Sequence, residues 1–367
     1  MLNLTPKRPQ SFISTRKWLF ITLLVLVLVI QLLGLNSAWI EQGYSTHFYV
    51  GVSKTLRAIT GWVPFSVGDL LYAALTVYLI TSIFRAFRNI RRKKRRFISS
   101  FPFMRYLVII LSIYVIFNVL WGINYDRQGI AKQIGLDVKP YTLKDLKDIQ
   151  EQLLLKTNES KLSLANMTKY PDKEGLFRRA KACYNVASMS YPFLSYHPPA
   201  LKSSLFGEIG DYLGFSGYYN PFTGEAQVNT TTPKMLIPYT TCHEIGHQMG
   251  YAKENEANFV GYLTATGSSD TLFRYSAYLD LFVYATREVA VYDSNFAKHS
   301  FASLIPPVKQ DLKEIREFWV RHENPIEPFI TWLYGKYLKA NKQPRGMQSY
   351  NEVTADLIAY YKKFGKI

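Results

Sequence analysis

The chain has 367 residues, of which 48% are hydrophobic and 15% aromatic, and its 44 Lys+Arg against 27 Asp+Glu give a net charge of +17. This composition excludes an intrinsically disordered chain, which would be poor in apolar and aromatic residues. The two cysteines are too few for a disulfide framework. A net charge this high is typical of proteins that bind nucleic acid or a membrane surface, and its distribution along the chain distinguishes the two.

Three apolar stretches occur in the first third of the chain, at about 18–35, 67–84 and 106–123. The first and third contain no charged residue, and the second contains only Asp69, within a helix-capping pattern that begins at Ser66. Each stretch is long enough to cross the hydrocarbon core of a bilayer. The first is not followed by the cleavage pattern of a signal peptide. The sequence therefore predicts three transmembrane helices.

Basic residues orient these helices. Lys7, Arg8, Arg16 and Lys17 precede the first stretch, and the loop 85–105 contains nine Lys+Arg. The positive-inside rule places both groups on the cytoplasmic side, which leaves the chain after residue 123 on the far side of the membrane.

The charge divides at the same point. Residues 1–123 hold 15 Lys+Arg and 2 Asp+Glu, whereas residues 124–367 hold 29 and 25. We therefore expect a membrane anchor at 1–123, whose basic loop 85–105 contacts anionic lipid headgroups, and an exported domain at 124–367. Because the second part is nearly balanced in charge and has no recognition motif, no nucleic-acid partner is expected.

The exported part has the pattern of an α-rich domain with a small β-sheet, which is an α+β fold. Apolar spacing predicts helices at Leu143–Leu155 and Leu176–Met189, and further helices between Asp270 and Phe364. Between them, residues 215–229 predict two strands around a turn at 220–224, and Pro238 leads into another helix.

That helix carries the motif His-Glu-Ile-Gly-His at 243–247. His243 and His247 lie four positions apart, so on a helix both imidazoles face one side and can bind one Zn²⁺. Glu244 can take a proton from a water held next to the metal. The alternative is a solvated helix face that carries two histidines and a glutamate by chance.

A zinc site needs a third protein ligand. One zincin pattern would place a histidine at position 253, where this chain has Lys253. Glu254 and Glu256 remain. Glu256 shares a helix face with the apolar residues three, four and seven positions later, a face expected to point inward, so we favour Glu256 over Glu254.

The segment Glu-Asn-Glu-Ala-Asn at 254–258 is similar to the start of the helix that supplies a Glu ligand in gluzincin-type metallopeptidases. Over nearly its whole length the chain also resembles a bacterial membrane family, domain of unknown function 3810. The shared features are the three apolar stretches and the segments PFSVGDLLY (64–72), GYYNPFTGEAQVN (217–229) and CHEIGHQMGYAKENEANF (242–259). This resemblance implies a bacterial inner-membrane protein with a zincin-like periplasmic domain and a metal site. The peptidase reaction is inferred from the motif.

In zincin folds, an edge strand above the motif helix pairs with an extended substrate, and Glu225–Asn229 is the candidate by position. Tyr218 and Tyr219 could supply a hydroxyl that stabilises an oxyanion, or could simply be paired strand aromatics. Cys183 and Cys242 could form a disulfide or remain two separate buried thiols.

The expected function is that of a membrane-anchored, zinc-dependent metallohydrolase, a peptidase acting on peptides or proteins of the cell envelope. His243, His247 and Glu256 would bind Zn²⁺, and Glu244 would be the catalytic base. The alternative is a catalytically silent zincin-like sensor or scaffold that binds envelope peptides.

Overall fold

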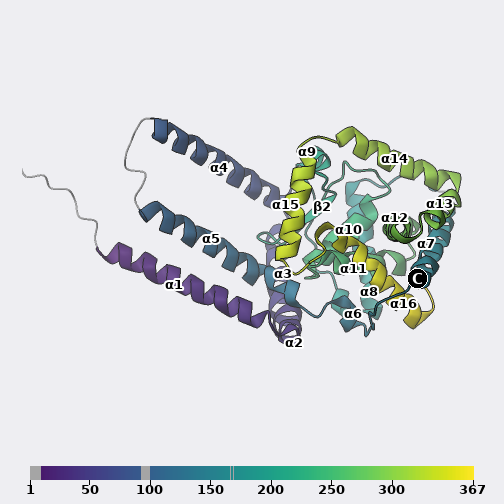
Figure 1. The fold of residues 1–367 in the computed structure, drawn as a ribbon, viewed down its shortest axis with the longest axis horizontal. Helices are drawn as coiled ribbons and strands as arrows, with labels where there is room; N and C mark the ends of the chain where they lie inside the picture. The colour runs from purple at the N-terminus through teal and green to yellow at the C-terminus, as the bar shows by residue number, and fades with distance from the viewer. Residues whose placement is uncertain (1–9, 92–99, 166, 168) are drawn as a thin grey trace, which may run out of the picture.

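The computed structural model describes residues 10–91, 100–165, 167 and 169–367. Three long helices, α1 (Gln10–Leu33), α4 (Val67–Arg91) and α5 (Ser100–Leu120), project in the same direction from a compact body (Figure 1). The body contains the remaining described elements and is mostly helical.

By length and composition, one described helical segment could cross a membrane, Val67–Arg85 within α4. A second candidate exists only if Lys17–Leu33 and Ser37–Thr60, which are bent by 98° relative to each other, form a single span. The apolar helix Met104–Leu120 in α5 is shorter than the usual length of a span. The three predicted transmembrane helices are therefore corrected to one or two candidate spans.

The third predicted stretch, 106–123, fails because it runs past the end of its helix. α5 ends at Leu120, the backbone of Trp121 is not helical, and a 3₁₀ turn, η3 (Gly122–Asp126), follows. Trp121 and Ile123 are buried, at 6% exposure each. The last apolar residues of the stretch therefore belong to the protein interior, which composition alone does not distinguish from a membrane interior.

Some of the basic residues used for orientation lie outside the described residues. These are Lys7, Arg8 and positions 92–99 of the loop 85–105. The predicted contact of this loop with lipid and the orientation of the chain stay predictions.

The segment between α1 and α4 packs on the body. It comprises α2 (Ser37–Trp39), a π-helical segment η1 (Ile40–Phe48) and α3 (Tyr49–Thr60). Tyr49 and Ser53, one helical turn apart, both donate hydrogen bonds to the carbonyl oxygen of Gln248, at 3.0 and 2.9 Å. Although the sequence division assigned this segment to the anchor, it contacts the helix that carries the His-Glu-Ile-Gly-His motif.

The start of α4 is also tied to the body. The backbone N–H groups of Val67 and Gly68 donate to the buried carboxylate of Glu225, at 3.1 and 2.6 Å, which matches a negative charge to the helix N-terminus. The Asp69 N–H donates to the Ser66 hydroxyl at 3.0 Å, as the capping pattern predicted.

The body is built around α10 (Ile237–Gln248), α11 (Glu254–Gly267) and α12 (Thr271–Tyr292), with α7 (Leu143–Ser163) and α8 (Lys173–Ser190) packed against them. Both helices predicted before residue 190 are confirmed as parts of α7 and α8. The other helical elements are α6 (Ile130–Gln133), η4 (Pro192–Leu194), α9 (Gly207–Leu213), α13 (Ser294–Ala302), α14 (Pro306–His322), α15 (Glu327–Ala340), η5 (Gly346–Glu352) and α16 (Val353–Phe364).

The sheet has three strands in the order β1–β3–β2, comprising β1 (Leu201–Ser203), β2 (Gly217–Asn220) and β3 (Glu225–Val228). β3 pairs in parallel with β1 and antiparallel with β2, where Tyr219 lies opposite Ala226. The α+β class and the turn between the two predicted strands are confirmed. The expectation that Glu225–Asn229 forms an edge strand is wrong, because β3 is central and β2 is the edge beside the motif helix.

Candidate metal centre

The two helices of the centre lie very close together because small residues face each other between them. A Cβ atom added at Gly246 of α10 would lie 3.3 Å from the Cα atom of Ala257 in α11. One added at Gly261 of α11 would lie 3.0 Å from the ring of Tyr239. Between the helices, Gly250 takes a positive φ of 90°, which favours glycine and reverses the chain. This reversal brings the first residue of α11 beside the last turns of α10.

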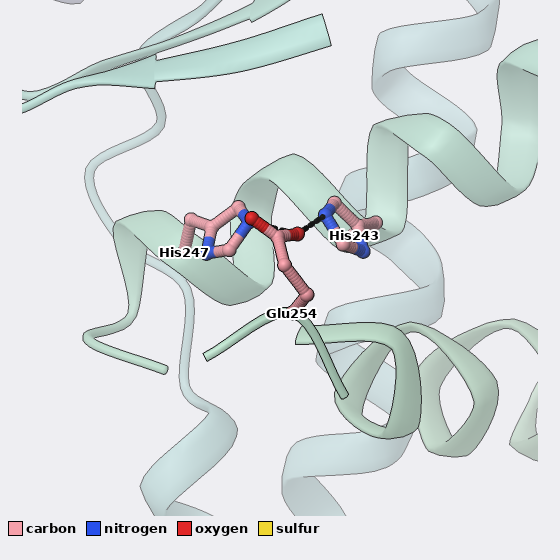
Figure 2. Close-up of side chains that lie close together, drawn as sticks. All are labelled: His243, His247 and Glu254. Carbon is pink, nitrogen blue, oxygen red and sulfur yellow. Dashed lines mark ion pairs between the residues drawn. The ribbon is translucent and has the colours of Figure 1, made fainter. Parts of the chain in front are cut away.

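The close packing brings three side chains together (Figure 2). The Nε2 atoms of His243 and His247 each lie 3.3 Å from Oε2 of Glu254. One potential ligand atom from each of the three residues lies within 4.8 Å of the others, and all three side chains are buried. This His–His–Glu group could hold a metal ion.

The histidine rings are oriented by hydrogen bonds at their other nitrogen. His243 Nδ1 lies 2.7 Å from Oδ1 of Asn258, and His247 Nδ1 lies 2.8 Å from the carbonyl oxygen of Tyr251. Both partners are acceptors, and the Asn258 amide is fixed because its Nδ2 donates to the Tyr350 carbonyl oxygen. Each Nδ1 therefore carries the hydrogen, and each Nε2 presents a lone pair, as in protein metal sites.

A cation fits this arrangement. Two Nε2 lone pairs and a carboxylate oxygen converge, and within the described part of the chain neither Glu254 Oε2 nor Glu244 Oε2 has a hydrogen-bond partner although both atoms are buried. Converging buried acceptors without a donor are costly unless a proton or a metal ion lies between them. Two imidazoles and one carboxylate form a ligand set suited to zinc, with a coordination position left open.

The electrostatics of the group reflect burial and proximity. Burial lowers the pKa of His243. Burial also lowers the pKa of His247, but the adjacent Glu254 carboxylate outweighs it and raises that pKa to about 9. In turn the two imidazoles hold the pKa of Glu254 below its usual range despite burial. The group therefore binds a proton strongly in the metal-free state, as expected of a site built for positive charge.

Glu244 points into the same site from the second position of the motif. It is only 3% exposed, and its carboxylate packs against β2, where a Cβ atom added at Gly217 would lie 2.5 Å from Oε1. Burial raises the pKa of Glu244 to about 8. A carboxyl group with such a pKa exchanges protons near neutral pH, which suits a general base.

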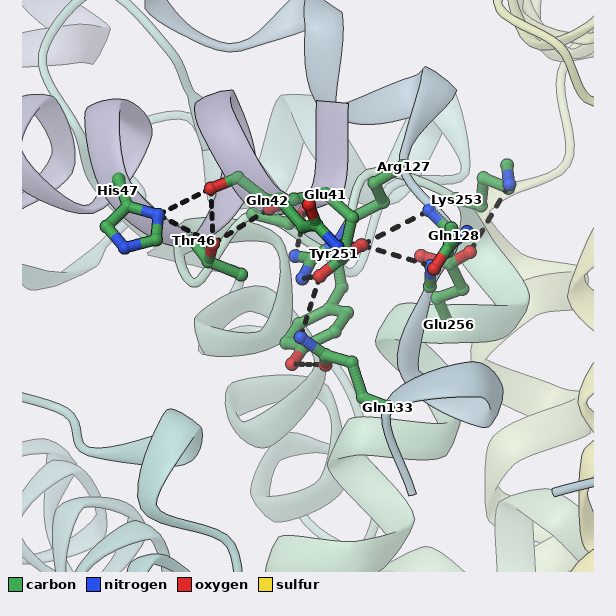
Figure 3. Close-up of polar contacts among 12 residues, drawn as sticks. Glu41, Gln42, Thr46, His47, Arg127, Gln128, Gln133, Tyr251, Lys253 and Glu256 are labelled. Atoms are coloured by element: carbon green, nitrogen blue, oxygen red, sulfur yellow. Dashed lines mark hydrogen bonds and ion pairs between the residues drawn. The ribbon is translucent and has the colours of Figure 1, made fainter. Parts of the chain in front are cut away.

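The structure groups Glu254 with the two histidines, and not Glu256, which the sequence favoured as the third ligand. Glu256 points away from the histidines and contacts Lys253 Nζ through Oε1 at 3.3 Å (Figure 3). Helical periodicity does not separate the two glutamates, because α11 is buried on nearly every side, including at Glu254 and Glu256. A helix that is surrounded by protein has no single inward face.

A polar network lies beside Glu256 and supports the centre from the side of η1 (Figure 3). Its central pair is Arg127 with Glu41, at 2.6 Å between Nη2 and Oε1, and both side chains are buried. Arg127 also donates to the Gly250 carbonyl oxygen at 3.0 Å, and its guanidinium lies 4.4 Å from the ring centroid of Tyr251. The network thus fixes the loop whose Tyr251 carbonyl orients His247.

Three further residues were not identified from the sequence. Asn258 orients His243, and its place four residues after Glu254 was a usable signal, because residues at that spacing share a helix face. Tyr334 donates a hydrogen bond to Glu254 Oε1 at 2.8 Å, and the ring of Tyr350 stacks on His243 with centroids 6.2 Å apart. Nothing local in the sequence marks either tyrosine.

Tyr218 and Tyr219 both lie in β2 beside the centre, but their hydroxyls are engaged elsewhere. Tyr218 donates to the carboxylate of Asp69, and the Tyr219 hydroxyl accepts from Tyr49 at 3.2 Å. The structure therefore places them near the site without directing either hydroxyl to the histidines.

A cavity of about 1810 Å³ contains the group. His243, Glu244, His247 and Glu254 line it, together with the edge strand β2. The cavity is large enough for a polypeptide segment of several residues beside the metal group.

Comparison with known proteins assigns the family. The family model described as "Protein of unknown function (DUF3810)" matches residues 44–358. The chain belongs to this family. The match covers the motif helix, the edge strand and the segment that follows α5. No curated protein and no solved structure matches the chain.

Cys183 and Cys242 are both free and buried. Cys183 Sγ donates to the Ser268 hydroxyl at 3.3 Å. Of the two alternatives left open by the sequence, the structure shows separate buried thiols.

Proposed function

We propose that the chain is a membrane-anchored, zinc-dependent hydrolase that cleaves peptide bonds in polypeptides of the cell envelope. The observation that carries this proposal is the convergence of His243, His247 and Glu254 in a cavity that also contains the buried Glu244. A structural zinc site is usually closed by four protein ligands, whereas a catalytic one has three.

His243, His247 and Glu254 would hold the ion, and Asn258 and the Tyr251 carbonyl would keep the imidazoles in the ligating tautomer. Bound zinc would supply Lewis-acid polarisation of a carbonyl and would acidify a water. Glu244 would accept the proton of the attacking water and return it to the leaving amine.

The edge strand β2 gives the substrate a binding surface. An extended polypeptide can add to an open strand edge through backbone hydrogen bonds. Because Gly217 has no side chain, the backbone of β2 can lie directly over Glu244. Tyr218 and Tyr219 would then serve as strand residues that shape the cavity.

Anchoring in the bacterial inner membrane, with the body in the periplasm, is part of the same proposal. It is supported by the candidate span in α4 and by the concentration of Lys and Arg in the loop 85–105. Zinc, the reaction and the orientation can each be tested.

The test compares wild type with Glu244→Gln in nanodiscs, using a randomised peptide library and mass spectrometry of the products. Both proteins should bind one zinc per chain, and Glu244→Gln should cleave at least about 100-fold more slowly, because it lacks the general base. Glu314→Gln, on the exposed side of α14, is the matched control. Bound zinc without cleavage by wild type would contradict the enzyme and favour a silent peptide sensor.

A further inference from the structure

α15 has an inner face that belongs to the metal cavity. Ile330, Tyr334 and Tyr337 line that cavity, and Tyr334 hydrogen-bonds to Glu254. One wall of the site is therefore a helix whose opposite side faces outward.

The outer face of α15, taken with its N-cap residue Ile326, carries four large apolar side chains, Ile326, Phe329, Trp332 and Leu333, which are between 50% and 60% exposed. Helical spacing places them on one side. Lys336 shares this side, with Nζ 5.6 Å from the ring centroid of Trp332. A face of this kind on a soluble surface marks a site of interaction.

Contacts with η3, the turn that follows α5, hold α15 and the loop after it near the end of α5. The hydroxyls of Tyr337 and Tyr125 lie 3.2 Å apart, and Lys342 Nζ lies 3.1 Å from Asp126 Oδ1. Figure 1 shows α15 at the junction of the body with the three long helices, running across their direction. The candidate span Val67–Arg85 in α4 covers roughly 28 Å at about 1.5 Å per residue, close to the ~30 Å of a hydrocarbon core. A bilayer around α4 and α5 would therefore have its surface at α15.

The cavity extends to the same region. Besides the metal group, it is lined by Tyr72 of α4 and by Ile113 and Phe117 of α5. Ile113 precedes the end of α5 by seven residues, roughly 10 Å along the helix axis. The space beside the metal group thus continues to the depth that a bilayer around α5 would occupy.

We propose that the outer face of α15 lies in the interfacial layer of this bilayer, and that the cavity takes polypeptides anchored in the same bilayer by an acyl chain or an apolar helix. The substrate class rests on the proposed hydrolase function. Aromatic side chains with a neighbouring lysine are typical of helices that lie at the membrane interface. A cavity bordered by such a helix and by α5 is open to a chain leaving the bilayer.

The position of α15 relative to the bilayer can be measured without an activity assay. A nitroxide at Leu333→Cys in full-length protein, in nanodiscs of phosphatidylethanolamine and phosphatidylglycerol, should collide with oxygen in preference to a water-soluble nickel complex. The matched site is Val291→Cys in α12, which is 78% exposed and should show the reverse preference. The two native cysteines are buried and provide a quiet background.

An oxygen-to-nickel ratio several-fold higher at Leu333 than at Val291 supports the interfacial position. Equal ratios would overturn it. Spin–spin broadening at Leu333 would also overturn it, because it would show that a second copy of the chain covers the outer face of α15.

The substrate class is tested with one randomised peptide library in two forms, free and N-terminally palmitoylated, in the same nanodiscs, with Glu244→Gln as the blank. Palmitoylated peptides should yield at least about tenfold more product, because the acyl chain concentrates them at the membrane. Equal cleavage would overturn the membrane-anchored substrate and leave the hydrolase intact. Absence of cleavage in both forms would contradict the hydrolase itself.

Discussion

The α10–α11 pair and the segments around it contribute to the metal centre in different ways. The pair supplies every proposed ligand from residues 243–254, and its close approach follows from glycines in those helices. Among the described residues, the surrounding segments add no member to this group, but they position it from far along the chain: Tyr334 is 80 residues from Glu254, and Arg127 is 123 residues from Gly250. The proposed ligands are thus close together in the sequence, whereas the residues that position them come from distant parts of the chain. Substitutions in the first region should remove metal binding, and those in the second should weaken the fold or the affinity.

The largest effect is expected within the pair. His247→Ala should lower zinc affinity by more than about 100-fold. Loss of a residue that only hydrogen-bonds to a ligand typically lowers affinity about 10–100-fold, and loss of the ligand itself should lower it further. Metal analysis after dialysis measures this, with His299→Ala on the exposed side of α13 as the control. Retention of one zinc by His247→Ala would contradict the claim that the α10–α11 pair supplies the ligands.

The next effect concerns the stability of the surrounding network. Glu41→Gln leaves the buried Arg127 guanidinium without its charged partner, so the free energy of unfolding should fall by about 3–5 kcal/mol. Asp148→Asn breaks the exposed, solvent-screened pair with Lys144 and should lower the free energy of unfolding far less. Denaturant unfolding in detergent compares the two, and equal losses would show that the network is not a determinant of the fold.

A smaller effect is expected at Tyr334, which touches a ligand but is not one. Tyr334→Phe removes the hydrogen bond to Glu254 and should lower zinc affinity about 10–100-fold. Tyr337→Phe, on the same helix, removes a hydrogen bond to Tyr125 instead and should leave the affinity unchanged. Competition with a fluorescent chelator reports both, and identical affinities would remove Tyr334 from the site.

The smallest expected effect is the change in zinc affinity for each unit of pH. Because Glu254 raises the pKa of metal-free His247 to about 9, a metal must displace a proton from this group at neutral pH. Zinc affinity should therefore rise about tenfold per pH unit from pH 6 to 8 and level off above the pKa. An affinity independent of pH over this range would contradict a protonated His247 in the metal-free protein.

The sequence predicted much of the α10–α11 pair. The spacing of His243 and His247 placed both imidazoles on one face, and the α-rich fold with a small sheet followed from periodicity and turn residues. Glu256 was preferred to Glu254 because one apolar face of α11 was assumed to point inward. The choice required knowing that protein surrounds the helix.

The packing of the surrounding segments could not be predicted from sequence patterns. The apolar residues at the end of the third stretch were assigned to a membrane, although Trp121 and Ile123 pack inside the body. Hydrophobicity measures transfer out of water, and it is similar for both destinations. The assignment of Glu225–Asn229 as an edge failed because the sequence did not predict β1, which pairs with the other side of β3.

The most direct test of the centre is the zinc content of Glu254→Gln and Glu256→Gln, measured side by side with wild type after dialysis. Both substitutions replace a buried carboxylate two residues apart on the same helix. We expect one zinc per chain for wild type and Glu256→Gln, and loss of zinc for Glu254→Gln. Zinc retained by Glu254→Gln and lost by Glu256→Gln would contradict ligation by Glu254.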